Sequence, residues 1–224
     1  MPGASNSFDG GSHATAITPA NSGGASGDAF AAADGTTYSS AQAYRGPLSA
    51  EITAGAIGYV QYPLSGTGSR WVRWYAKPTS AMNSLVEIAL VNGDIVGLDI
   101  GSGQLTLWRM TGFQQANLDT ETFTPPGGWI RLEVQANADN SGFAAARVYA
   151  TPEASTPTVS LSGSDVVVAS TWSAVRVGGV NDGTTSAWTD EVAWSDQGWI
   201  GPLPETSIAP PRIPSAAAHR AATW

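Results

Sequence analysis

The acidic residues near the carboxyl end of the chain are the first candidates for catalysis. Asp190, Glu191 and Asp196 lie close together in the sequence. A retaining glycosidase needs two carboxyl groups about 5–5.5 Å apart, which alternate residues of one strand can supply. Asp190 and Glu191 are adjacent and would face opposite sides of a strand, and Asp196 lies too far along to pair with Asp190. The spacing therefore predicts acids that cap strand ends and line turns, and a chain that is not an enzyme.

Nucleophilic catalysis and metal binding have few candidate residues. The chain has no cysteine, and its two histidines, His13 and His219, lie near the ends, away from any rigid element that could hold a Ser-His-Asp arrangement. Loop carboxylates can hold Ca²⁺, but no spacing singles out a set among Asp94, Asp99, Asp119, Asp139 and Asp182. We expect no catalytic residue and no cofactor, with calcium left open.

Aromatic side chains are the stronger candidates for binding. Nine tryptophans is a large number for a small β protein, and an exposed ring can stack on a sugar while Asp, Asn or Gln fixes its hydroxyls. Such rings are also enriched at subunit interfaces, although most Trp residues in sandwiches pack between the sheets. The side chains expected to contact a glycan or a neighbouring subunit are Trp71, Tyr75, Trp108, Phe113 and Trp172.

The segment that must position the carboxylates has the pattern of two strands and a turn. Small and apolar residues alternate over Ala174–Val180 and Ala187–Ser195, and Asn181-Asp182-Gly183 supplies turn residues between them. We expect these strands to form the closing hairpin of an antiparallel sandwich. One face of the second strand is predicted to carry Trp188, Asp190, Val192 and Trp194.

The middle of the chain shows the same period of two. Arg70–Lys77 and Trp129–Ala136 alternate, which predicts Val72, Trp74 and Ala76, and likewise Ile130, Leu132 and Val134, on the core side. A turn at Asn92-Gly93-Asp94 should join the strands of a meander, which are Ser84–Val91, Ile95–Ile100 and Gln104–Arg109. Other expected strands are His13–Pro19, Asp28–Ala32, Leu48–Thr53 paired with Ile57–Pro63, Phe143–Thr151 and Val166–Ala169. About a dozen strands without a helix predict an all-β antiparallel sandwich.

The amino-acid composition limits the classes of partner that the chain is expected to bind. The chain of 224 residues has a formal net charge of −8, one lysine, Lys77, and no basic run. A phosphate surface demands a positive patch, which argues against nucleic acid and anionic membrane. No signal peptide and no apolar stretch long enough to span a membrane are visible, so we expect no membrane insertion.

The two ends differ from the predicted sandwich, which covers residues 13–202. Residues 1–12 are rich in glycine and serine, and residues 203–224 contain a dense group of prolines followed by alanines. Such ends suit extended arms rather than strands. The C-terminal arm is predicted to anchor the chain in a homo- or hetero-oligomeric assembly through Pro210, Pro211, Arg212, Arg220 and Trp224.

The stretch Asp190–Asp196, followed by Gly198-Trp199-Ile200-Gly201-Pro202, resembles the last strand of laminin-G-like, concanavalin A-like jelly-roll domains. The resemblance is to those of actinobacterial proteins and their tailed bacteriophages in particular. Ser7–Gly11 and Asn21–Phe30 suit the opening strands of that group, so the resemblance covers residues 6–202. Domains of this type often bind Ca²⁺ through loop carboxylates.

The resemblance implies two functions, because this fold hosts lectins, hydrolases and structural modules alike. The first is a non-enzymatic structural protein of a tailed phage particle, either a minor tail or tail-tip component or a capsid-decorating one. Its arms would bind other virion subunits, and its sandwich would contact host cell-wall glycan. The alternative is a carbohydrate-binding adhesion module of a bacterial surface or of a secreted protein.

Overall fold

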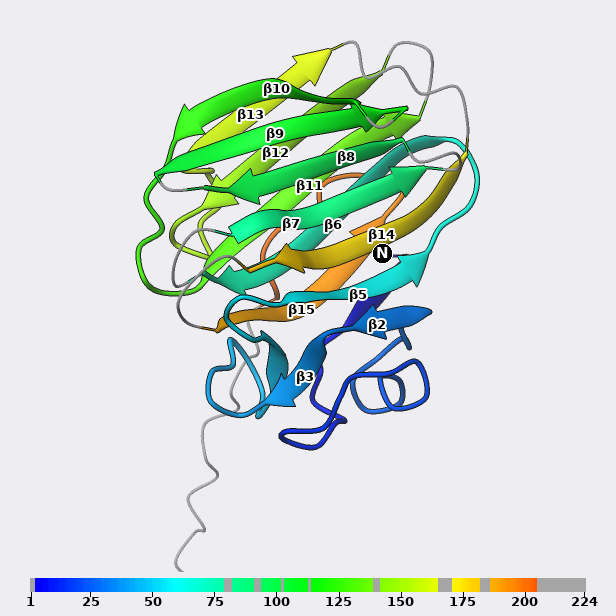
Figure 1. Ribbon diagram of the computed structural model, residues 1–224, viewed down its shortest axis with the longest axis vertical. Coiled ribbons are helices and arrows are strands. Elements are labelled where there is room, and N and C mark those ends of the chain that lie inside the picture. Colours follow the sequence, from blue (N-terminus) through cyan, green and yellow to red (C-terminus); the bar gives the residue numbers. More distant parts are fainter. Residues whose placement is uncertain are drawn as a thin grey trace, which may run out of the picture.

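The computed structural model describes residues 3–78, 82–90, 94–101, 103–112, 114–138, 142–164, 171–181 and 186–204. Every regular element within these ranges is a β-strand, and the strands form two antiparallel sheets packed face to face (Figure 1). The expected all-β sandwich of the concanavalin A-like jelly-roll type is confirmed. The same ranges contain no helix with the length and apolar character of a membrane span.

The first sheet has eight strands, in the order β13–β12–β11–β6–β15–β4–β3, with β1 also paired to β15. β1 pairs with residues 192–194 of β15 and β4 pairs with residues 187–189, so the two share one side of that strand. The strands are β1 Ala4–Asn6, β3 Thr36–Ser39, β4 Ser49–Ile52, β6 Gly68–Lys77, β11 Ile130–Ala138, β12 Phe143–Tyr149, β13 Val159–Ser164 and β15 Ala187–Ser195.

The second sheet has seven strands, in the order β10–β9–β8–β7–β14–β5–β2. They are β2 Ala32–Asp34, β5 Ile57–Pro63, β7 Met82–Leu90, β8 Ile95–Ile100, β9 Gln104–Thr111, β10 Gln114–Thr122 and β14 Trp172–Val180. The expected meander is confirmed as β7, β8 and β9. It continues into β10, which the sequence did not predict because that edge strand is polar and exposed along most of its length.

One apolar core lies between the sheets. Val72, Trp74 and Ala76 of β6 point into it, as do Ile130, Leu132 and Val134 of β11, and both predicted faces are confirmed. Removing such side chains from water is the main favourable term that holds the sheets together. The alternate residues of these strands necessarily lie on the outer face of the first sheet.

The expected closing hairpin is wrong. β14 and β15 are consecutive, but β14 pairs with β5 and β7 in the second sheet, and β15 pairs with β6, β4 and β1 in the first. β4 and β5 are likewise in different sheets, so the predicted Leu48–Thr53 and Ile57–Pro63 hairpin is also wrong. Alternation determines which side of a strand meets the core, but a strand in either layer satisfies it.

A bulge changes the predicted faces of β15. The register with β6 shifts between Asp190 and Ala193, and Glu191 has a left-handed φ of 51°. The extra residue shifts the alternation by one position. Val192 belongs to the core and Trp194 packs against it, whereas Asp190 lies outward among the polar groups described below. The four residues predicted to share a face are therefore divided.

Residues 3–11 form part of the sandwich rather than an arm over residues 1–12. Phe8 is fully buried against Phe30, with ring centroids 5.5 Å apart. The buried Asn6 amide donates hydrogen bonds to the carbonyls of Ser22 (2.5 Å) and Asp28 (2.9 Å). One buried ring and one buried amide thus order a segment whose glycine and serine content indicates flexibility.

Three shorter predictions have mixed outcomes. His13–Pro19 contains turns and a single bridge between Ala16 and Thr37 rather than a strand, and the strand expected at Asp28–Ala32 begins later, as β2. β13 was not predicted. Val166–Ala169 and the C-terminal arm beyond Pro204 lie outside the described residues.

Candidate functional site

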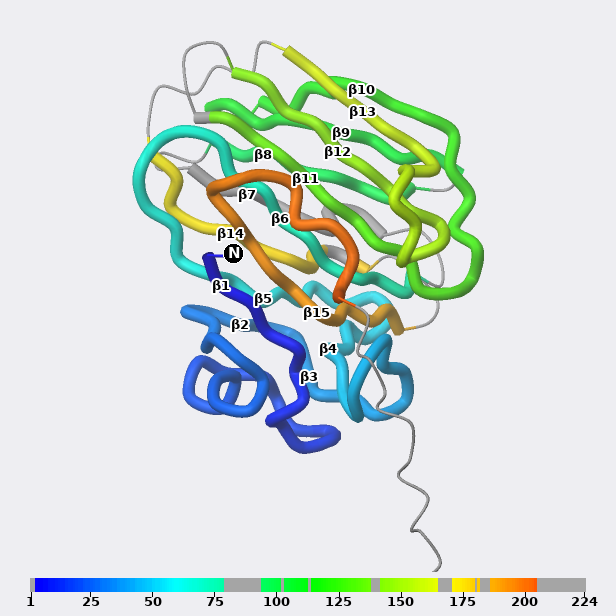
Figure 2. Tube along the Cα trace, turned by 180° about the vertical axis from the view of Figure 1, so that it is seen from behind, coloured from blue at the N-terminus to red at the C-terminus, as the bar shows by residue number. Residues whose placement is uncertain are grey.

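The outer face of the first sheet is divided into a covered part and an open part. After β15 the chain turns back across this face, over β11 and β6 (Figure 2). We call residues 196–204 the C-terminal strap. Its Trp199 reaches β12, where the guanidinium of Arg147 lies 4.0 Å from the indole centroid. The strap therefore separates a buried polar network on one side from an accessible hollow on the other.

The covered part contains charged side chains that are almost wholly removed from water. Arg131 and Glu133 lie two residues apart on β11, so they share the outer face, and their Nε and Oε1 atoms are 3.1 Å apart. Each of these side chains is only 1% exposed. Burial raises the pKa of Glu133, while the neighbouring Arg131 and Arg73 act to lower it. A buried ion pair of this kind is strongly destabilising to break, because the remaining charge has no water around it.

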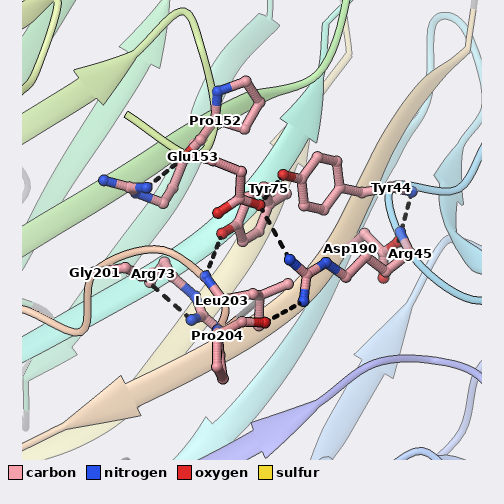
Figure 3. Close-up of polar contacts among 11 residues, drawn as sticks. Tyr44, Arg45, Arg73, Tyr75, Pro152, Glu153, Asp190, Gly201, Leu203 and Pro204 are labelled. Atoms are coloured by element: carbon pink, nitrogen blue, oxygen red, sulfur yellow. Dashed lines mark hydrogen bonds and ion pairs between the residues drawn. The ribbon is translucent and has the colours of Figure 1, made fainter. Parts of the chain in front are cut away.

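Hydrogen bonds from this network hold the strap in place (Figure 3). The Leu203 amide donates to the Tyr75 hydroxyl over 2.9 Å, and Arg45 donates from its Nη1 to the Pro204 carbonyl over 2.9 Å. Arg73 donates more weakly to the Gly201 carbonyl over 3.4 Å. The rings of Tyr75 and Tyr44 stack with centroids 4.1 Å apart. The strap and the loop containing Tyr44 are therefore attached to the same side chain of β6, Tyr75.

Asp190 attaches the loop containing Tyr44 a second time, and Arg131 attaches one further loop. Asp190 is fully buried and accepts backbone N–H groups from Tyr44 (2.8 Å), Arg45 (3.2 Å) and Glu191 (2.8 Å). Burial raises the Asp190 pKa to about 8, although these N–H groups act to lower it. Arg131 donates to the carbonyls of Pro152 and Ala154. These charged groups position loops and have no access to a substrate, so the geometry gives them no catalytic role.

The open part is a hollow over β11, β12 and β13 with a volume of about 260 Å³. We call it the face hollow. Trp199 is half-buried at its margin, and Phe143 is an exposed large apolar side chain, at 40%. The other residues that line the face hollow include the polar side chains Gln135, Arg147, Ser160 and Ser162. This set combines flat rings with hydrogen-bonding groups, which is the chemistry that a sugar ring requires.

A second hollow of about 580 Å³ adjoins the first where the edges of the two sheets meet. We call it the edge hollow. Phe143 and Ser162 line both hollows, so the two lie side by side, and we call them together the groove. The groove is shaped by a register shift in β10 around Leu118, whose side chain covers Gly163. The Asp119 carboxylate next to it accepts the Ser162 N–H over 2.9 Å and so links the edge strands of the two sheets.

The structure places the predicted contact residues in different surroundings. Tyr75 and Trp172 have 0% and 1% exposure, and Trp108 has 3%, so the surface exposure expected of these three is corrected. Trp172 lies in the core and donates to the Gly68 carbonyl, Tyr75 lies below the strap, and Trp108 lies against Gly97. Trp71 is half-buried, and it lies opposite Gln135 of the face hollow. Its contact with a glycan stays a prediction.

Some predicted residues lie outside the described part of the chain. They are Phe113 and the arm residues Pro210, Pro211, Arg212, Arg220 and Trp224. The groove residues Trp199, Phe143 and Arg147 were not predicted as a site. The Gly-Trp-Ile-Gly context of Trp199 indicated a fold back onto the protein, but only the tertiary structure brings it to Arg147, which precedes it by about fifty residues.

The described residues contain no group of three or more His, Cys, Asp or Glu side chains that could hold a metal ion. Two of the loop acids considered for calcium, Asp139 and Asp182, lie outside these residues. Calcium binding stays a prediction.

No protein-family model matches the chain, and no curated protein sequence is significantly similar to it. Solved structures do share its fold. Cellulose-induced protein Cip1 superposes with a TM-score of 0.55 at 13% identity, over 74% of this chain and 87% of that one. Domain 4 of AbnA, an extracellular arabinanase from Geobacillus stearothermophilus solved with arabinotriose, has a TM-score of 0.51 at 18% identity, over 88% and 92%. An alginate lyase solved with an alginate trisaccharide has a TM-score of 0.54 at 10% identity, over 88% and 99%. At these identities the likeness establishes the fold.

Proposed function

We propose that this chain is a non-enzymatic carbohydrate-binding domain whose site is the groove formed by the face hollow and the edge hollow. The observation that carries the proposal is the lining of the face hollow. A half-buried Trp199 and an exposed Phe143 flank Gln135, Ser160 and Ser162 on a rigid sheet. Aromatic planes can stack on the apolar face of a pyranose, and neutral polar groups can fix its hydroxyls.

The fold is consistent with this proposal. A domain of similar fold, domain 4 of the arabinanase AbnA, was solved with arabinotriose. Because a similar fold is also found in an alginate lyase, the fold alone does not distinguish a binding domain from an enzyme. That distinction rests on the site.

We propose that the chain is not an enzyme because of where its carboxylates lie. The residues that line the two hollows include no Asp, Glu or His. The outer-face acids Glu133 and Asp190 have 1% and 0% exposure and hold other parts of the chain. Hydrolysis requires an accessible acid and base on either side of the scissile bond. We expect mass spectrometry of oligosaccharides incubated with the protein to find no shortened products, and such products would overturn this part of the proposal.

Binding is tested on a glycan array, followed by calorimetry on the best ligands. Trp199→Ala and Phe143→Ala should each weaken binding by at least tenfold, because each removes a stacking plane. Ile57→Ala is the matched control, since Ile57 is 65% exposed but does not line either hollow. If the array is empty, or if the Ile57 variant loses as much affinity as the other two, the proposal fails.

We propose the surface of a tailed phage particle as the place of action, with a bacterial surface or a secreted protein as the alternative. The support is the motif resemblance around Asp190–Pro202. Mass spectrometry of purified particles should detect the chain together with other virion subunits. Removal of residues 205–224 should prevent incorporation but leave a folded domain; normal incorporation would contradict the anchoring role of the arm.

A further inference from the structure

Two arginines of this acidic chain line the groove. The protein has 18 acidic and 10 basic residues. Arg109 nevertheless lines the edge hollow and Arg147 the face hollow, with no acidic residue among the lining of either. Arg147 therefore brings positive charge to the face hollow of a protein whose net charge is −8, whereas the edge hollow has the Asp119 carboxylate beside it, at the Ser162 N–H.

The carboxylate of Glu133, which is next to Arg147, does not neutralise the charge of Arg147. Glu133 lies directly opposite Arg147 in the pairing of β11 with β12, and opposite Arg73 in the pairing of β11 with β6. It already forms an ion pair with Arg131 at 3.1 Å. One buried carboxylate thus faces three arginines, and a positive excess remains on the side of Arg147.

Arg147 is also held in a geometry suited to an anion. Its guanidinium lies over the Trp199 ring, 4.0 Å from the centroid. A guanidinium stacked on an aromatic ring keeps its N–H donors around its rim, in the plane that a carboxylate approaches. Within the described part of the chain Arg147 makes no hydrogen bond, whereas Arg70, Arg73, Arg131 and Arg45 all donate to backbone carbonyls.

We infer that the glycan bound in this groove is acidic, and that Arg147 receives a carboxylate of a uronic acid residue. This inference rests on the proposed function and specifies its ligand. The sugar ring lies on the aromatic side chains, the carboxylate meets the fork of Arg147, and the hydroxyls face Gln135 and the serines of β13.

The test measures affinity by calorimetry for three probes of similar length: an oligogalacturonate, a sulfated oligosaccharide and a neutral cello-oligosaccharide. We expect the wild-type chain to bind the oligogalacturonate at least tenfold more tightly than the neutral probe, with an affinity that falls as salt is raised. Arg147→Gln should remove most of this preference but leave weak binding. Arg147→Lys should recover only part of it, because lysine keeps the charge and loses the fork. Arg176→Gln is the matched control, on the other sheet.

The outcomes separate this inference from the proposed function. Equal binding of the neutral and acidic probes, with no effect of Arg147→Gln, overturns the acidic ligand but supports a carbohydrate-binding groove. Tighter binding of the sulfated probe overturns the carboxylate assignment. Failure to bind any glycan overturns both. If Arg147→Gln is unstable in thermal unfolding, Arg147→Lys and the salt dependence of the wild-type chain still decide the question.

Discussion

Replacing Asp190 with asparagine should change how the stability of the protein depends on pH. Burial holds the pKa of Asp190 in the folded chain at about 8, whereas an aspartate in an unfolded chain has a pKa of about 4. Between these values the folded state keeps a proton that the unfolded state has released. The free energy of unfolding therefore falls as the pH rises through this window. The contribution of Asp190 is fully present below the unfolded pKa and is lost as the pH passes the folded pKa.

The magnitude follows from the width of the window. Each pKa unit corresponds to about 1.4 kcal/mol, so a window of roughly four units sets an upper limit of about 5 kcal/mol. Three backbone N–H groups point at the Asp190 oxygens and favour the ionised form. The pKa of about 8 already includes their effect. Because the range from pH 5 to pH 8 covers about three pKa units, we expect a measured loss of about 2–4 kcal/mol across it. Asparagine does not titrate. Its one oxygen can accept the N–H groups of Tyr44 and Arg45, and its NH2 then faces the Glu191 N–H, a cost that does not change with pH.

The assay is urea denaturation followed by tryptophan fluorescence at several pH values in this range. As the pH rises, the free energy of unfolding of the wild-type chain should fall steadily relative to that of Asp190→Asn. Burial also raises the pKa of Glu133 and Glu191, but both remain in the variant, so the subtraction removes most of their effect. Asp196→Asn is the control, because Asp196 is exposed and its pKa is lowered. If the free energies of unfolding of the wild-type chain and Asp190→Asn change in parallel with pH, the reasoning is refuted.

Three further changes test the packing that supports the site. Trp172→Ala should lower the free energy of unfolding by about 3–5 kcal/mol, since this core side chain is 1% exposed; a loss below 1 kcal/mol in urea denaturation would contradict its placement. Gly97→Ala should destabilise by about 1–3 kcal/mol, because a methyl group there would collide with the Trp108 ring; an unchanged melting temperature would show that Trp108 lies elsewhere. Tyr75→Phe removes the acceptor of the Leu203 N–H and should cost about 1 kcal/mol, with faster proteolysis of the strap; equal proteolysis rates would remove the strap's dependence on this bond.

Much of the fold could be predicted from local pattern. The two-residue alternation in β6 and β11 identified their core faces correctly, because a strand with one buried face must place apolar residues at every second position. The meander was predictable for the same reason together with its tight turns. The polar edge strand β10 and the short β13 carry no such pattern, and they were missed.

The site was less predictable. The alternation correctly directed Trp71, Arg73 and Tyr75 outward, but outward and exposed are not the same property. The strap and the loop containing Tyr44 pack over Tyr75, which is fully buried. The hydrogen bonds that hold these two segments join residues more than a hundred positions apart. Trp199 and Arg147 meet for the same kind of reason.

The sequence by itself determined an all-β sandwich, the inner and outer sides of its central strands, the lack of cysteine chemistry and the acidic net charge. These properties depend on residue type and on spacing along one strand. The tertiary structure alone decided which sheet each strand joins, where β15 bulges, which outward side chains are covered and where the groove lies. These properties depend on pairing between distant segments, which local alternation satisfies equally well in several arrangements.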